Sequence, residues 1–210
     1  MKSLLLIILI TVQSVTLFSQ ETNNAKTILD KVSEKTRSYN SIKTDFDFIM
    51  ENKEVDLREV NHGQIILKNN KYKLNLNSIE IYNNGETQWT YMPDAEEVNI
   101  SEAVTDEDDY MNPANIFTMY ENGFTYSLKG ETPSGNYQIE LTPDEIKDFS
   151  KIILEIEKDS YKIDKAIMTG TDGNTYSIEL KNWDVSKTYP ETTFRFNSED
   201  YPSVNVIDMR

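Results

Sequence analysis

The sequence predicts a mainly β protein of the α+β class, with helices packed against one face of a sheet. From residue 41 onward, apolar and polar residues alternate with a period of two in a series of short runs. Turn-forming Gly, Asn and Asp residues separate most of these runs. Helical spacing is confined to residues 25–37 and 112–120. We therefore expect roughly ten or eleven strands in an antiparallel meander, with two or three helical pieces on one side.

The N-terminus has the layout of a signal peptide. Lys2 precedes an apolar run from Leu4 to Ile10, and the small residue Ser19 stands where cleavage is expected. Polar residues follow this run, which is shorter than the roughly 20 apolar residues that span a bilayer. The pattern predicts a signal peptide at residues 1–19 and one domain at residues 20–210.

Composition excludes several classes of function. The protein has no cysteine, so it forms no disulfide, carries no thiol nucleophile and has no N-terminal cysteine to be lipidated. It has 36 acidic and 21 basic residues, a formal net charge of -15 at pH 7. Nucleic acids and anionic bilayer surfaces both require a basic footprint and are therefore poor partners.

The first half of the chain contains one helix and a series of half-buried strands. Ala25, Ile28, Leu29 and Val32 have the spacing of one helix face. Alternation then predicts strands at residues 46–50, 64–68, 72–76, 79–82 and 88–91. Asn84-Gly85 predicts a tight turn between the last two, because Asn and Gly accept positive φ values.

The second half continues the same rhythm after an interruption. Residues 98–100 form a short run, residues 102–109 are acidic without a strand pattern, and Asn112-Pro113 starts a predicted helix that extends to Tyr120. Further strands are predicted at residues 124–128, 137–141, 152–156, 163–168, 176–180 and 194–196.

No motif for catalysis or metal binding is present. His62 is the sole histidine, and a zinc site or catalytic triad would need more ligands or partners than it offers. Carboxylates are abundant, but none sits in a recognisable motif and most occupy strand positions that face water. Asp106 to Asp109 could offer oxygen ligands to calcium, yet the segment lacks the central glycine and the following glutamate of a calcium loop. We therefore expect neither an enzyme nor a metal protein.

The strands carry more apolar surface than two short helices can cover. A second sheet, a closed barrel or a cavity for a hydrophobic ligand would each account for this excess. Burial tendencies alone favour a core role for each apolar residue.

The ordered series of motifs resembles the periplasmic lipoprotein carriers of the LolA type. The most specific match is Asn84 to Pro93, NGETQWTYMP, which resembles that family's D-G-x-x-x-W-x-Y-x-P hairpin. The other matching segments are the helix at residues 28–32, Asp45-Phe46, GQIILK at residues 63–68, the short helix at residues 112–117 and the closing segment at residues 194–208.

This resemblance implies an incomplete antiparallel β-barrel of about eleven strands, with short helices forming a lid over the concave apolar face. Acyl chains of lipoproteins would lie in that cavity. The resemblance further implies a cofactor-free, monomeric periplasmic carrier, loaded by an inner-membrane transporter and unloaded by an outer-membrane acceptor. The residues expected to line the cavity are Leu29, Val32, Phe46, Phe48, Leu67, Leu74, Leu76, Trp89, Tyr91 and Phe117.

One position departs from the family pattern. Where the best-known carriers have an arginine that ties the lid, Lys68 is followed here by Asn69, which is uncharged and has a shorter reach. The sequence therefore leaves open a same-fold module that binds or senses lipid without acting as a general carrier. An acid-dependent hydrolase is the remaining, weaker alternative.

Overall fold

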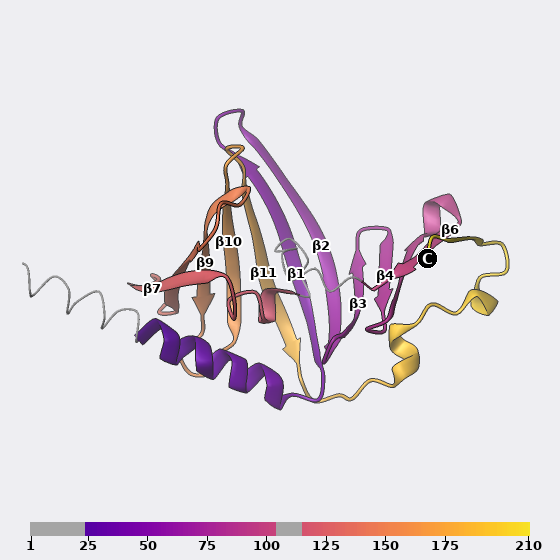
Figure 1. The fold of residues 1–210 in the computed structure, drawn as a ribbon, viewed down its shortest axis with the longest axis horizontal. Helices are drawn as coiled ribbons and strands as arrows, with labels where there is room; N and C mark the ends of the chain where they lie inside the picture. The colour runs from indigo at the N-terminus through magenta and orange to yellow at the C-terminus, as the bar shows by residue number, and fades with distance from the viewer. Residues whose placement is uncertain (1–23, 104–114) are drawn as a thin grey trace, which may run out of the picture.

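The computed structural model describes residues 24–103 and 115–210, in which twelve strands form one continuous open sheet (Figure 1). The strands are β1 (Ile42–Asn52), β2 (Leu57–Lys68), β3 (Lys71–Leu76), β4 (Ile79–Asn83), β5 (Thr87–Met92), β6 (Glu97–Glu102), β7 (Phe124–Glu131), β8 (Tyr137–Pro143), β9 (Phe149–Ile156), β10 (Ile163–Gly170), β11 (Thr175–Asp184) and β12 (Asn205–Asp208). Four 3-10 helices accompany them, η1 (Pro93–Ala95), η2 (Asn115–Phe117), η3 (Glu191–Phe194) and η4 (Ser198–Asp200).

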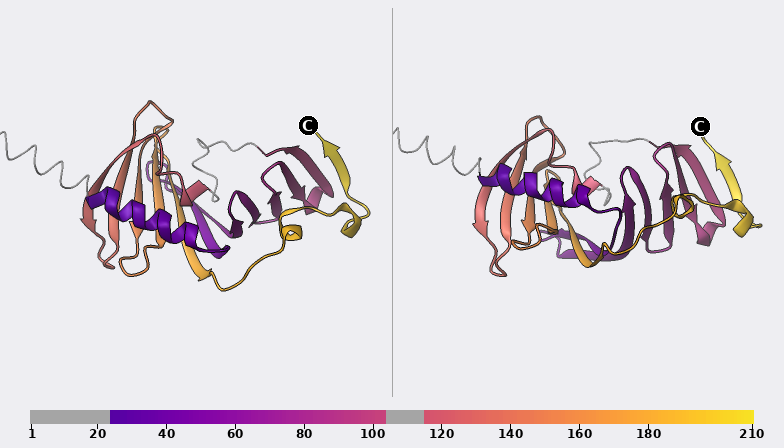
Figure 2. Two further views of the ribbon diagram at one scale, coloured as in Figure 1. Left: turned by 60° about the horizontal axis from the view of Figure 1, so that its bottom comes forward. Right: turned by 90° about the horizontal axis from the view of Figure 1, so that it is seen from below.

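Two meanders meet in the middle of this sheet. The strand order is β12-β6-β5-β4-β3-β2-β1-β11-β10-β9-β8-β7, so β1 lies between β2 and the distant β11. All pairings are antiparallel except that of β12, which runs parallel to β6. The sheet curls around one side of the molecule and is not closed into a barrel (Figure 2).

The number of strands and two of the elements differ from those that the sequence predicts. The sheet has twelve strands, where ten or eleven are expected from the alternation. Residues 194–196, predicted as a strand, lie in and after η3, where Phe194 is fully buried and Phe196 packs on Tyr82 and Tyr91. The helix predicted at residues 112–120 falls partly outside the described residues, and its described part is the short turn η2.

The described N-terminal α-helix, residues 24–38, forms as the apolar spacing predicts. Ala25, Ile28, Leu29 and Val32 are all buried, while Lys26 and Asp30 form an exposed ion pair one turn apart at 2.7 Å. The helix lies across the strands β7 to β11, as the two views of Figure 2 show.

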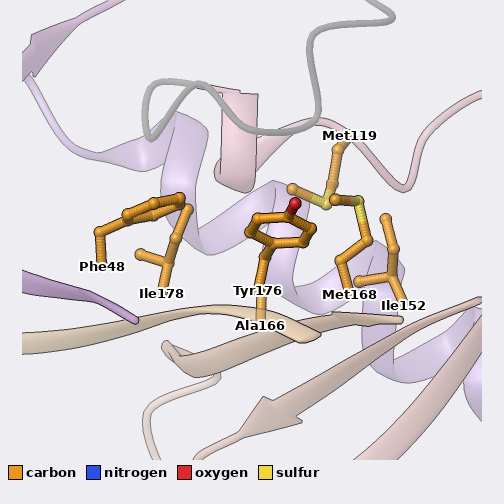
Figure 3. A pocket seen from close by; sticks show the side chains of 7 residues that line it. All are labelled: Phe48, Met119, Ile152, Ala166, Met168, Tyr176 and Ile178. Atoms are coloured by element: carbon orange, nitrogen blue, oxygen red, sulfur yellow. The ribbon is translucent and has the colours of Figure 1, made fainter. Parts of the chain in front are cut away.

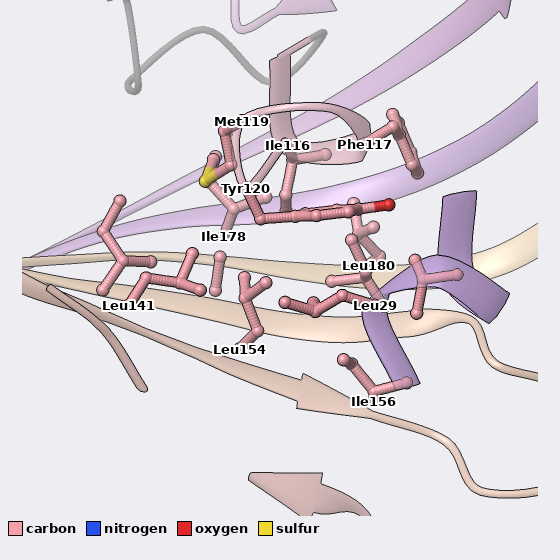
Figure 4. Close-up of a cluster of buried hydrophobic side chains, with 14 of the residues drawn as sticks. Leu29, Ile116, Phe117, Met119, Tyr120, Leu141, Leu154, Ile156, Ile178 and Leu180 are labelled. Carbon is pink, nitrogen blue, oxygen red and sulfur yellow. The ribbon is translucent and has the colours of Figure 1, made fainter. Parts of the chain in front are cut away.

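The pairing registers define two faces of the sheet. Side chains alternate along each strand, and directly paired residues share a face. We call the face that carries Leu74 and Ile178 the inner face and the face that carries Asp47 and Tyr91 the outer face. The main buried cluster combines the inner face with the N-terminal helix and residues 116–120 (Figure 4).

A glycine lets the central strands pack closely on the inner face. Gly63 is paired with Phe46 across β1 and β2, and a Cβ at position 63 would overlap the Phe46 ring. The Phe46 ring is buried, at 1% exposed, and it fills the space that a side chain at position 63 would need.

A second apolar cluster covers the outer face of the β3 to β6 half. The C-terminal strap, residues 185–204, places η3 against β3 and β4. The ring of Phe196 lies 5.9 Å from that of Tyr82 and 5.1 Å from that of Tyr91, and Tyr201 stacks on Phe196 at 5.0 Å. The strap thus supplies this half of the sheet with its own small aromatic core.

Charged groups fix the start of the strap to the hairpin between β2 and β3. Lys68 donates to the carboxylate of Glu191 at 2.8 Å and to the carbonyl of Tyr189 at 3.0 Å, and Lys71 also pairs with Glu191. These two lysines lower the pKa of Glu191 to about 2. Glu191 is therefore ionised at neutral pH.

Candidate functional site

An apolar pocket lies on the inner face, between β1, β11, β10 and β9 (Figure 3). The space between its side chains amounts to about 260 Å³, a figure that includes open solvent. Its lining residues are Phe48, Met119, Ile152, Ala166, Met168, Tyr176 and Ile178. None of these side chains is charged, so the pocket suits an uncharged hydrocarbon better than a polar metabolite.

The pairing of strands far apart in sequence brings the lining residues together. Phe48 pairs with Ile178 across β1 and β11, Ile178 pairs with Ala166, and Met168 pairs with both Tyr176 and Ile152. The rings of Phe48 and Tyr176 stack at 6.5 Å. Two of the lining residues are methionines, whose flexible side chains adapt to ligands of different shape.

Residues 115–121, which we call the cover segment, close the pocket from the side opposite the sheet. Ile116, Phe117, Met119 and Tyr120 are all buried in this segment. Met119 lies above the ring of Tyr176 and beside Met168 (Figure 3). The Phe117 ring meets that of Trp183 edge-on at 5.5 Å. The cover segment therefore fills space on the inner face that the strands alone leave open.

Polar contacts join the cover segment to the N-terminal helix. Arg37 donates to both carboxylate oxygens of Glu121 at 2.7 and 2.6 Å, and the hydroxyl of Ser33 donates to Glu121 at 2.9 Å. The hydroxyls of Ser33 and Tyr120 also lie 3.2 Å apart, and burial raises the pKa of Tyr120 to about 12. We call these four residues the clasp. Tyr120 is thus a neutral hydroxyl at physiological pH, whereas the Arg37–Glu121 pair is charged.

The structure brings eight of the ten predicted cavity residues into one contiguous cluster. Leu29, Val32, Phe46, Leu74 and Phe117 are buried in it, and three more side chains pack against it while partly exposed. Those three are Phe48, Leu67 and Leu76. Among the ten, Phe48 lines the pocket itself.

Trp89 and Tyr91 lie apart from the other eight. Trp89 pairs with Tyr82, and Tyr91 pairs with Glu80, so both side chains point to the outer face. Tyr91 contacts Phe196 and Tyr201 of the strap there. Both side chains therefore lie on the outer face and not in the space beneath the cover segment.

Asn69, the predicted latch position, occupies the exposed turn between β2 and β3 with a φ of 55°. The hydrogen bonds that hold the cover segment to the N-terminal helix come instead from Ser33 and Arg37. Neither residue stands out in the sequence, because Ser and Arg on the polar side of a helix usually face solvent.

Six of the seven pocket residues are not among the ten that the sequence predicts. They are Met119, Ile152, Ala166, Met168, Tyr176 and Ile178. Ile152, Met168, Tyr176 and Ile178 do stand in the alternating runs that predict β9 to β11. Their alternation marks them as inward facing, but it does not show which strands are neighbours.

Metal binding and membrane spanning find no support in the part of the chain that the structure describes. Residues 24–103 and 115–210 contain no group of three or more His, Asp and Glu side chains placed to hold a metal ion. The same residues include no helix long and apolar enough to cross a bilayer. The predicted signal peptide and the acidic residues 106–109 lie outside the described residues.

Comparison with known proteins gives one family match and several similar folds. The model of the family described as "Outer membrane lipoprotein carrier protein LolA" matches residues 15–172. An uncharacterized conserved protein from Thermus thermophilus superposes with a TM-score of 0.60 at 12% identity, covering 88% of this chain and 99% of that chain.

Two further solved structures are similar. A DUF1329 family protein from Desulfovibrio piger has a TM-score of 0.50 at 10% identity and covers 83% of this chain and 97% of its own. The LolA superfamily protein NE2245 from Nitrosomonas europaea has a TM-score of 0.43 at 14% identity, with coverages of 82% and 97%. No match was found among curated proteins.

Proposed function

Because the chain belongs to the outer membrane lipoprotein carrier family of the LolA type, we propose that it carries acylated lipoproteins across the periplasm. The acyl chains bind on the inner face of the sheet, in the pocket beneath the cover segment. The observation that carries this proposal is the pocket itself, which is lined by seven uncharged residues from four strands and the cover segment. Binding and release need no covalent step, so we propose a carrier and not an enzyme.

The energetics suit a hydrocarbon ligand. Each methylene moved from water into an apolar site contributes about 0.8 kcal/mol. In this structure the lining side chains leave too little free space between them for a long acyl chain. A long acyl chain therefore needs the cover segment to move, and Met119 is the side chain in that segment that it would displace.

We propose that the N-terminal helix and the cover segment act together as the lid. The clasp joins these two elements. While it is intact, the helix and the cover segment move as one unit, and when it opens they can separate. Such an opening would be driven at two steps. These are the loading of the carrier by an inner-membrane transporter and its unloading to an outer-membrane acceptor. The transporter and the acceptor are proposed from family membership.

A direct test is to titrate a fluorescent fatty-acyl probe into the purified protein and then displace it with a diacylated or triacylated peptide. We expect saturable binding of the probe and its competitive release by the peptide. Native mass spectrometry of protein isolated from its own compartment should show an acylated species bound to it. Absence of saturable probe binding, with the fold intact by circular dichroism, would contradict the proposal.

Glu121→Ala is expected to tighten the apparent binding of the acyl probe. The change removes the bonds of Glu121 to Arg37 and Ser33, and the pair is partly exposed, with Arg37 67% and Glu121 25% accessible. We therefore expect about 1 kcal/mol or less of lid stabilisation to be lost. If the closed state predominates in the empty protein, the apparent Kd falls by up to about fivefold.

Asp30→Ala is the matched control for this prediction. It removes an exposed ion pair with Lys26 on the same helix and leaves the bonds of Glu121 to Arg37 and Ser33 in place. The probe should bind this variant as it binds the wild type. An unchanged Kd for Glu121→Ala would show that the clasp does not limit access to the pocket.

A further inference from the structure

Tyr176 is the one residue that places a polar group in the otherwise hydrocarbon lining of the pocket. Its hydroxyl lies 3.1 Å from a carboxylate oxygen of Asp172 and 3.3 Å from the side-chain nitrogen of Asn174. Both partners belong to the turn that joins β10 to β11. The pocket therefore has an apolar body and one polar end, at this turn.

The polar end is well ordered by hydrogen bonds. Asp172 accepts from the backbone N–H of Asn174 at 2.9 Å and from its side chain at 2.6 Å. Asn174 is in turn bonded through its side chain to Asn52, at the end of β1, at 2.8 Å. The bonds from Asn174 lower the pKa of Asp172, so its carboxylate is ionised at neutral pH.

The neighbouring loops add more negative than positive charge at this end of the sheet. Thr171 donates from its backbone and its hydroxyl to the carbonyl of Asp148, at 2.9 and 3.0 Å, which fixes the loop between β8 and β9 beside the turn. The charged residues of the three adjacent loops are Lys53, Glu54, Asp56, Asp144, Glu145, Lys147, Asp148 and Asp172. A ligand whose polar group lies here meets a negative potential.

An amphiphile binds such a pocket with its tail among the apolar residues and its polar group at the polar end. We propose that the pocket selects acyl chains whose polar end is uncharged or cationic, such as an ester, an amide or an amine. It discriminates against chains that end in a carboxylate or a phosphate. This inference rests on the proposed acyl-binding function and specifies the ligand class for the same site.

Tyr176 and Asn174 supply the hydrogen bonds for this selection. The Tyr176 hydroxyl can donate to a ligand carbonyl when it turns away from Asp172, whereas the Asn174 amide group can donate only by giving up its 3.3 Å bond to that hydroxyl. Asp172 accepts from an amide N–H or an ammonium group but repels an anion. Free fatty acids would therefore bind more weakly than chains in ester or amide linkage.

The test uses three probes with the same alkyl chain and different polar ends, namely a fatty acid, its primary amide and the corresponding alkylammonium. Each is titrated at pH 8 and low salt into the wild type, Asp172→Asn and Asp159→Asn. Asp159 lies in the loop between β9 and β10, at the opposite end of the same strands. It thus provides the same change of net charge away from the polar end.

We expect the wild type to bind the ammonium and amide probes more tightly than the carboxylate. Asp172→Asn should reduce the ratio of ammonium to carboxylate affinity about three- to tenfold at low salt, and high salt should reduce the ratio in the wild type. Asp159→Asn should leave the ratio at its wild-type value.

Two results would overturn the inference while leaving the acyl-binding function in place. In the first, the three probes bind the wild type equally. In the second, Asp172→Asn and Asp159→Asn change the affinity ratio by the same factor, which would assign the selectivity to net charge. Failure of all three probes to bind would instead overturn the proposed function, and the inference with it.

Discussion

Phe194→Ala is expected to lower the free energy of unfolding by about 3–5 kcal/mol, the range for removing a fully buried phenylalanine. Phe194 is 0% exposed and lies in η3, which packs on β3 and β4. Its loss leaves a cavity between the strap and the outer face, and the adjacent aromatic contacts of Phe196 weaken with it. Urea unfolding followed by tryptophan fluorescence and circular dichroism measures the change.

Thr192→Ala is the control for this variant, because Thr192 is exposed in the same short helix. We expect it to change stability by about 0.5 kcal/mol or less. A loss below about 1 kcal/mol for Phe194→Ala would show that the strap can detach without cost to the sheet. The test is informative because the strap lies beyond residues 15–172, the part of the chain that the family model matches.

Ala166→Phe is expected to weaken binding of the acyl probe roughly 30- to 150-fold. Ala166 lines the pocket and is 6% exposed, so a phenyl ring at this position projects into the space proposed for the ligand. Exclusion of three or four methylenes forfeits about 2–3 kcal/mol, which corresponds to that factor. The probe titration measures the loss, and thermal unfolding establishes that the variant is folded.

Ile167→Phe serves as the matched control, since Ile167 is the next residue of β10 and points to the outer face, paired with Ser177 and Ile153. It adds a bulky ring to the same strand without entering the pocket. We expect its affinity for the probe to equal that of the wild type. Equal affinities for Ala166→Phe and the wild type would place the acyl chain elsewhere on the inner face.

Local patterns predict the elements of this fold well. The four buried residues of the N-terminal helix follow directly from their spacing, because a helix with one apolar stripe has one way to bury it. A turn is also found at Asn84-Gly85, with Asn84 bonded to Thr87 across the hairpin, although three residues separate β4 from β5 and only Gly85 of the pair has a positive φ, of 89°. Both features depend on residues within a few positions of one another.

The assignment of faces is harder to predict, and β4 and β5 show why. In β4, Ile81 points to the inner face and Tyr82 to the outer face, and both are covered. When both faces of a strand are covered, apolar residues can occupy both of them. The alternation of apolar and polar residues that would reveal the orientation of the strand is then lost. The sequence therefore predicts Tyr91 in the cavity, although the strap, some 100 residues later in the chain, covers it on the other side.

The central seam between β1 and β11 also determines the order in which the protein can fold. The hydroxyl of Thr44 donates to the carbonyl of Lys181, a residue 137 positions further along the chain. Each meander can assemble from neighbouring hairpins, but β1 keeps an unpaired edge until β11 has been made. Such distant pairing slows folding toward the millisecond-to-second range. During that interval the open edge of β1 is the place at which a newly made chain is most exposed to aggregation.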